Sequence, residues 1–108
     1  MNLLQKPAPK PWEIWYADVQ FEEGVGSKKR PVLVLENGVG FVLSFKITSQ
    51  LKANGYQITR WAEASLNRAS ILLIHKKISI NSQSFIFKIG RLHPADIINV
   101  NRLMKTTP

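Results

Sequence analysis

Cysteine is absent from this chain of 108 residues, and acidic side chains are scarce. Without cysteine there are no disulfides and no thiolate metal sites, and two histidines remain as the only soft metal ligands. We therefore expect neither a metal nor a cofactor. No run of about 18 apolar residues predicts a membrane span, and residues 1–6 lack the apolar core of a signal peptide. These absences favour a cytoplasmic protein that has no membrane partner.

Seven Asp and Glu residues stand against fifteen Lys and Arg, which gives a formal net charge of +8. On so small a protein this charge creates a strong positive field, which favours nucleic acid, an anionic membrane surface or an acidic protein as partner. The charge by itself does not choose among these partners. Hydrophobic residues make up 44% of the chain, so the composition is that of a folded protein with one core.

The length is typical of one domain. Residues 1–11 contain three prolines and two lysines and are predicted to form an extended N-terminal arm, while residues 12–108 form the domain. Strands are predicted over residues 12–19, 30–35, 39–48, 56–61, 70–80 and 85–90, and a helix opens at His93-Pro94. We expect a mainly β fold, a small antiparallel barrel with a C-terminal α-helix, because a barrel protects strand edges.

The most informative segment is Lys28-Lys29-Arg30-Pro31, which runs directly into an apolar strand. Pro31 lacks a backbone donor and favours extended geometry at Arg30, so it is tolerated only where a strand begins or at a sheet edge. The Arg30 guanidinium is thus held where a buried strand emerges into solvent. Its planar set of donors suits a phosphate group. The alternative is a solvated cationic cap on a core strand.

Asn37-Gly38 is a strong signal for a tight hairpin, which makes residues 39–48 the antiparallel return strand. The beginning of the first strand then lies beside the end of the second, which brings Arg30 near Lys46 and Thr48. Alternation of side chains places Lys46 and Thr48 together on an open face. A guanidinium, an ammonium and a hydroxyl at one edge can bind a phosphate. The alternative is a chance juxtaposition of polar strand ends.

Five segments, taken in order, resemble the MazF/PemK toxins of bacterial type II toxin–antitoxin systems. They are Trp12–Val19, the Arg30-Pro31 strand, Lys46-Ile47-Thr48-Ser49, the middle segment with Trp61, Ala62, Leu66 and Ser70, and Lys88-Ile89-Gly90-Arg91-Leu92. The resemblance extends over about residues 12–104. It implies an SH3-like barrel of the CcdB/PemK type that assembles as a homodimer.

The resemblance also implies a toxin that acts as a metal-independent endoribonuclease, or mRNA interferase, on single-stranded RNA. In this family the ribose 2′-hydroxyl attacks the adjacent phosphate, and the products carry a 2′,3′-cyclic phosphate and a 5′-hydroxyl. A cognate antitoxin protein blocks the site with an extended acidic or hydrophobic tail. These activities and partners are expectations for this chain.

The family motifs match catalytic positions at Arg30 and Thr48. An acidic residue and a second Arg that some relatives carry are missing here, and His75 is the candidate that could transfer protons in their place, because its unperturbed pKa lies near working pH. No metal ligand is expected. The residues expected to bind RNA are Lys28, Lys29, Lys46, Ser49, Lys76 and Lys77.

Two other functions fit the same sequence. One is a non-catalytic interaction protein on the same fold, either a gyrase-poisoning toxin or a decayed toxin that only binds an antitoxin. The other is a basic nucleic-acid-binding barrel with no protein partner. Neither requires Arg30 and Thr48 to act together, so these two residues discriminate between the functions.

Overall fold

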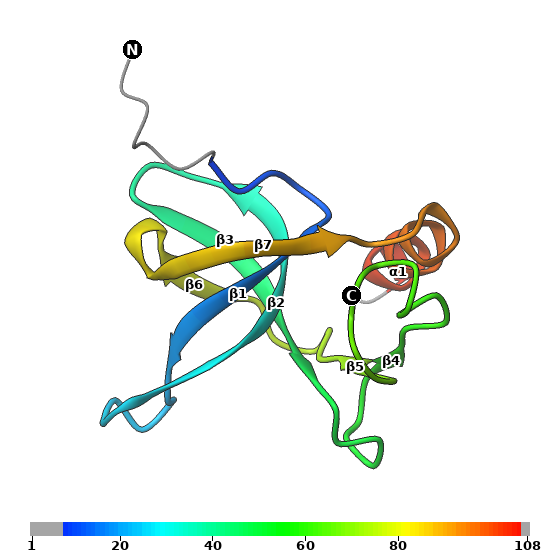
Figure 1. The fold of residues 1–108 in the computed structure, drawn as a ribbon, viewed down its shortest axis with the longest axis horizontal. Helices are drawn as coiled ribbons and strands as arrows, with labels where there is room; N and C mark the ends of the chain where they lie inside the picture. The colour runs from blue at the N-terminus through cyan, green and yellow to red at the C-terminus, as the bar shows by residue number, and fades with distance from the viewer. Residues whose placement is uncertain (1–7, 107–108) are drawn as a thin grey trace.

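The computed structural model of the protein describes residues 8–106, which form a single antiparallel sheet, a short 3-10 turn and one α-helix (Figure 1). The elements in order are β1 (Glu13–Gln20), β2 (Ser27–Asn37), β3 (Phe41–Thr48), β4 (Tyr56–Gln57), β5 (Ile71–Leu72), β6 (Ile78–Asn81), η1 (Ser82–Ser84), β7 (Phe85–Arg91) and α1 (Pro94–Thr106). The predicted class, mainly β with one C-terminal helix, is confirmed.

The sheet has seven strands; six follow the order β4-β5-β3-β2-β1-β7, and β6 pairs with β3 on the edge opposite β2. Every pair is antiparallel. The sheet curls strongly (Figure 1), but its two ends, β4 and β7, are not paired with each other in the part of the chain that is described. The predicted barrel is therefore not closed by hydrogen bonds.

Apolar side chains form two clusters, one on each side of the curled sheet. One cluster lies between the sheet and α1 and includes Ile14, Leu33 and Phe45, all at most 1% exposed. The other lies inside the curl and includes Trp15 and Val32. Strand β3 contributes to both, so the face predicted to be open is buried over its first half and becomes polar only toward its end.

Helix α1 is held to the sheet by Asp96, a fully buried carboxylate in its first turn. It accepts hydrogen bonds from the Tyr56 hydroxyl, from the Thr59 backbone N–H at 3.0 Å and hydroxyl at 2.8 Å, and from the Arg60 backbone N–H at 2.9 Å. Because a buried charge is tolerated only when it is fully hydrogen-bonded, Asp96 fixes the position of the segment that follows β4. In Figure 1 this segment passes close to the helix.

Two predicted strands are shorter than expected. The strand predicted over residues 56–61 is only Tyr56–Gln57, because the backbone N–H groups of Thr59 and Arg60 turn toward Asp96 instead of a neighbouring strand. The strand predicted over residues 70–80 is interrupted between β5 and β6. The interruption carries His75, Lys76 and Lys77, whose side chains are exposed. The strand predicted over residues 70–80 is therefore wrong between Leu72 and Ile78.

Most of the predicted N-terminal arm, residues 1–7, lies outside the described residues. Residues 8–11 pack against the domain: Pro9 is buried and its carbonyl accepts a hydrogen bond of 2.8 Å from the Asn37 side chain. Over the described range, no helix has both the length and the apolar composition needed to cross a bilayer.

Replacing Asp96 with Ala should lower the free energy of unfolding by about 3 kcal/mol, because it leaves buried donors without their charged acceptor. Chemical denaturation monitored by circular dichroism measures this change. The control is Asn101→Ala, which removes an exposed side chain from the same helix and should change stability by less than about 0.5 kcal/mol. Equal effects of the two substitutions would contradict the anchoring role of Asp96.

Acid should weaken the fold through the same carboxylate. Burial acts to raise the pKa of Asp96, but the hydrogen bonds from Tyr56, Arg60 and Thr59 outweigh it and hold that pKa below its usual value. The stabilisation is therefore fully present above the unfolded-state pKa of about 3.9 and is lost as pH falls through the lower folded-state pKa. Below pH 4, the free energy of unfolding should fall less steeply with decreasing pH for Asp96→Asn than for the parent protein, as measured by denaturation at each pH. The same dependence on pH in both proteins would refute the linkage.

Candidate active site

Strands β2 and β3 are no longer paired where β2 carries the cationic residues Lys28, Lys29 and Arg30. Val32 and Lys46 are the last residues paired between them, and β3 then pairs with β5 through Ile47 and Thr48. A pocket of about 390 Å³ lies where the strands diverge. We call it the Thr48 pocket, and its polar lining includes Lys28, Lys29, Arg30, Thr48, Ser49 and Arg68.

The register between β2 and β3 decides which side chains share a side of the sheet. Asn37 lies opposite Val42 near the turn, but β2 carries one extra residue between Val34 and Glu36, so Val32 lies opposite Lys46. Continuing this register by two residues brings Arg30 level with Thr48. Residues at the same level of antiparallel strands project to the same side. The predicted meeting of Arg30 and Thr48 is therefore found in the structure.

The Thr48 hydroxyl is oriented by the chain that follows it. Its oxygen accepts a hydrogen bond of 3.1 Å from the backbone N–H of Gln50. A hydroxyl that accepts in this way keeps its own hydrogen available to donate. Because Thr48 is only partly buried and lines the pocket, it can donate this hydrogen to an anionic oxygen bound there.

The cations of the Thr48 pocket have no carboxylate partner within residues 8–106. The ion pairs found in this range involve Lys46, Arg60, Lys76, Lys88 and His93, and none of them involves Lys28, Lys29 or Arg30. Their positive charge is thus left uncompensated at short range. A pocket with this lining attracts a phosphate or another anion.

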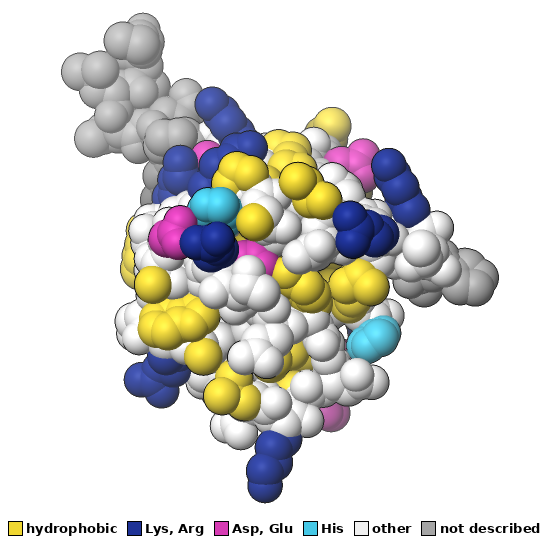
Figure 2. Space-filling view, turned by 90° about the vertical axis from the view of Figure 1, so that its right-hand side faces the viewer, with side chains coloured by type: hydrophobic (Ala, Val, Ile, Leu, Met, Phe, Trp, Pro, Cys, Tyr) yellow, Lys and Arg dark blue, Asp and Glu magenta, His cyan; other side chains and the backbone are white. Residues whose placement is uncertain are grey.

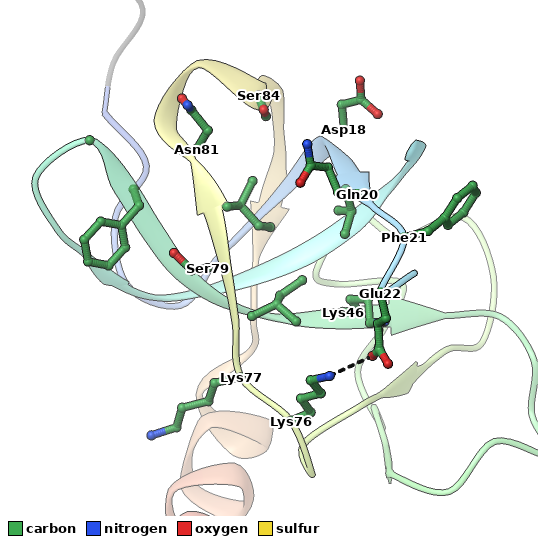
Figure 3. Close-up of a pocket in the computed structure, with 15 residues that line it drawn as sticks. Asp18, Gln20, Phe21, Glu22, Lys46, Lys76, Lys77, Ser79, Asn81 and Ser84 are labelled. Atoms are coloured by element: carbon green, nitrogen blue, oxygen red, sulfur yellow. Dashed lines mark ion pairs between the residues drawn. The ribbon is translucent and has the colours of Figure 1, made fainter. Parts of the chain in front are cut away.

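Lys46, Lys76 and Lys77 line a second and larger hollow of about 620 Å³ between the β1–β2 loop and β6, which we call the Lys76 cleft. Figure 3 shows Glu22 reaching from the loop toward Lys46 and Lys76, while Lys77 extends away from it. The Glu22 carboxylate lies 3.2 Å from the Lys76 ammonium and 3.6 Å from that of Lys46. The hydrogen bond from Lys76, its charge and that of Lys46 hold the pKa of Glu22 below its usual value.

A small pocket of about 200 Å³ joins these two hollows. It shares Lys28 and Arg30 with the Thr48 pocket, and Glu22 and Lys46 with the Lys76 cleft. The three hollows are therefore neighbours along the ends of β2 and β3, and we call them together the groove. By contrast, the face of the molecule that carries α1 shows Lys and Arg side chains scattered among hydrophobic ones, without a comparable concentration of charge (Figure 2).

His75 is absent from the lining of the Thr48 pocket. It lines another hollow beside the last turn of α1, together with Phe45, Leu103 and Met104, and this hollow shares Lys76 and Lys77 with the Lys76 cleft. The structure thus brings Arg30 and Thr48 together but leaves the third predicted catalytic residue elsewhere. The separation follows from the interruption between β5 and β6, which turns His75 outward.

Arg68 and Glu22 line the groove but were not among the predicted site residues. Arg68 reaches the Thr48 pocket from the segment that follows Trp61, and Glu22 pairs with Lys46 and Lys76 in the Lys76 cleft. The unusual length of the β1–β2 loop was a signal for Glu22, but no local pattern marked Arg68. Within residues 8–106, no three His, Asp or Glu side chains gather closely enough to hold a metal ion.

Comparisons with known structures agree with this fold. The chain is similar to the Mycobacterium tuberculosis toxin MazF-mt6, with a TM-score of 0.66, 21% identity and coverage of 83% of this chain and 89% of that one. It is also similar to an endoribonuclease from a mycobacterial species (TM-score 0.69, 13% identity, coverage 93% and 90%). A third similar structure is the MazE–MazF complex of Deinococcus radiodurans (TM-score 0.71, 16% identity, coverage 93% and 95%). At these identities the similarity shows the fold alone.

Comparison with curated protein sequences found no match. The profile of a sequence family described as "PemK-like, MazF-like toxin of type II toxin-antitoxin system" matches residues 10–107. That range contains the whole sheet, the helix and every residue of the groove. The chain therefore belongs to the PemK-like, MazF-like family of toxins of type II toxin–antitoxin systems.

Proposed function

We propose that the protein is a toxin that cleaves single-stranded RNA in the Thr48 pocket, without a metal ion. The observation that carries this proposal is that a guanidinium and an oriented hydroxyl line one pocket, while the cations beside them have no carboxylate partner among the described residues. Membership of the toxin family and similarity to a mycobacterial endoribonuclease support it.

In the proposed reaction the ribose 2′-oxygen attacks the adjacent phosphorus, and the bond from phosphorus to the 5′-oxygen breaks. The products carry a 2′,3′-cyclic phosphate and a 5′-hydroxyl. Arg30 donates hydrogen bonds to the non-bridging phosphoryl oxygens, where negative charge grows in the transition state. One preorganised contact of this kind contributes on the order of 3 kcal/mol. Thr48 donates its hydroxyl hydrogen to the same phosphoryl group.

The rest of the groove would bind the RNA on either side of the cleaved linkage. Lys28, Lys29, Ser49 and Arg68 surround the Thr48 pocket, and their donors suit the neighbouring phosphates. Lys46, Lys76 and Lys77 would continue this contact in the Lys76 cleft. Binding through phosphates should depend strongly on salt. His75 has no part in this proposal because it does not line the Thr48 pocket.

The partners follow from the same groove and from the family. An antitoxin with an acidic or hydrophobic tail fits a positively charged groove that also binds RNA, and one of the similar structures is a MazE–MazF complex. We therefore propose a cognate antitoxin as inhibitor. We also propose, from family resemblance, that the active protein is a homodimer in the cytoplasm.

Replacing Arg30 with Ala should reduce cleavage of a single-stranded RNA about 10²- to 10³-fold, because the transition-state charge loses its main hydrogen-bond donor. The assay follows product formation in EDTA by gel electrophoresis, and the product ends are identified by chemical treatment. Arg102→Ala is the matched control, since it removes an exposed arginine from α1, and should cleave at the parent rate.

Three results would overturn the proposed function. They are intact RNA after incubation with the parent protein, equal loss of activity in the Arg30 and Arg102 variants, or products with a 3′-hydroxyl. Intact RNA together with normal RNA binding would instead favour a basic binding protein on the same fold.

Replacing Thr48 with Val should slow cleavage about ten- to a hundredfold, whereas Thr48→Ser should stay within about threefold of the parent rate, because only the hydroxyl is needed. The hydrogen bond from Gln50 that Val removes is exposed, so both variants should keep the parent melting temperature. Cleavage rates under single-turnover conditions test this. Equal rates for Val and Ser would remove Thr48 from the mechanism.

A further inference from the structure

Glu22 contacts the Lys76 cleft in a way that the proposed cleavage reaction does not require. Its carboxylate pairs with both Lys46 and Lys76, at 3.6 and 3.2 Å. The two lysines come from different parts of the sheet, one from β3 and one from the segment before β6. Glu22 is therefore the single anion on which these two cations converge.

The loop that carries Glu22 is held by its own backbone. The Phe21 N–H donates to the Gly26 carbonyl at 3.1 Å, and the Gly24 N–H donates to the Phe21 carbonyl at 3.0 Å. Gly24 and Gly26 both have a φ near +80°, which favours glycine at these turn positions. The backbone thus keeps Glu22 beside the groove, so that only its side chain has to move for the lysines to be released.

The two lysines differ in how much they depend on this partner. The Lys46 side chain is 20% exposed, whereas those of Lys76 and Glu22 are 62% and 56% exposed. A largely covered ammonium gains more from a nearby anion than an exposed one. The Glu22 side chain, in contrast, has open solvent into which it can rotate. Another anion can therefore take the place of the Glu22 carboxylate without steric hindrance.

A phosphodiester offers the same chemistry to these lysines as the carboxylate does. Both present oxygens with delocalised negative charge to ammonium donors. Glu22 and Lys46 also line the small pocket that leads to Arg30, so an RNA strand leaving the Thr48 pocket passes this point. A phosphate that binds Lys46 and Lys76 has to displace Glu22 first.

We propose that Lys46 and Lys76 form a phosphate subsite for the RNA next to the cleaved linkage, and that Glu22 occupies this subsite in the free protein. This inference rests on the proposed function for the identity of the ligand. Glu22 is then an internal competitor that lowers the affinity for RNA. Its removal strengthens binding without adding any new contact.

Binding of a fluorescein-labelled, fully 2′-O-methylated RNA oligonucleotide of mixed sequence tests the proposal, because this probe has no 2′-hydroxyl and is not consumed. Fluorescence anisotropy should show that Glu22→Gln binds about three- to tenfold more tightly than the parent protein, since the ion pairs of Glu22 with Lys46 and Lys76 no longer have to be broken. Glu23→Gln is the matched control. It removes the same charge from the next residue of the loop, which lines the small pocket as Glu22 does but has no ion pair within residues 8–106, and should change affinity by less than about twofold.

A double-mutant cycle separates a local contact from a general effect of charge. In the background of Lys76→Met, the gain from Glu22→Gln should shrink by a factor of at least about two, because one of the two lysines that Glu22 blocks is gone. Circular dichroism melting of each variant checks that the fold is retained, as expected for substitutions at exposed side chains.

The outcomes distinguish the two proposals. Equal gains for Glu22→Gln and Glu23→Gln, an unchanged gain in the Lys76→Met background, or no detectable RNA binding by any variant would each overturn the role of Glu22. If the gain is specific to Glu22 while the parent protein leaves unmodified RNA intact, the subsite stands and the nuclease proposal fails. If the parent protein cleaves RNA and Glu22→Gln binds as the parent does, the nuclease proposal stands and the role of Glu22 fails.

Discussion

The side of the sheet on which Arg30 projects depends on one extra residue in β2. The pairing near the turn, with Asn37 opposite Val42, would bring Arg30 level with Ser49 if it continued unchanged, and Thr48 would then point to the other side. The extra residue between Val34 and Glu36 shifts the register by one, which exchanges the two sides. A β-bulge of this kind redirects side chains at the cost of local pairing. The groove depends on this shift.

The second requirement is that β3 extends beyond its ladder with β2. That ladder ends at Lys46, while on the opposite edge of β3 Ile47 and Thr48 pair with β5. Strands β2 and β3 separate at Pro31, which has no backbone N–H. The separation therefore leaves one fewer backbone donor without a partner than it would at any other residue type. The gap becomes a pocket lined by side chains of both strands. Its far wall includes Arg68, from a segment whose beginning is fixed by the hydrogen bonds that Asp96 accepts from Thr59 and Arg60. The helix thus supports the groove from a distance.

Charge along the groove is arranged in two ways. Around the Thr48 pocket the cations stand without carboxylate partners in the described chain, whereas Lys46 and Lys76 share Glu22. An unpaired guanidinium is ready to receive a phosphate, while a paired lysine has to exchange one anion for another. Both arrangements lie along the same groove. How each cation can bind a phosphate therefore depends on whether it has a carboxylate partner, which the net charge of +8 does not show.

The sequence by itself determined the class of the fold, the strand that holds Arg30 and the helix at Pro94, because each has a local cause: an apolar run, a missing proline donor, a favourable first helical position. It also indicated the hairpin, and hence that Arg30 and Thr48 lie at the same end of two neighbouring strands. Only the tertiary structure decided that they share a side, since this depends on turn length and on a bulge, and a shift of one residue reverses it. The tertiary structure likewise separated His75 from the Thr48 pocket and brought Arg68 and Glu22 into the groove. These positions follow from contacts between segments distant in the chain, which local patterns do not encode.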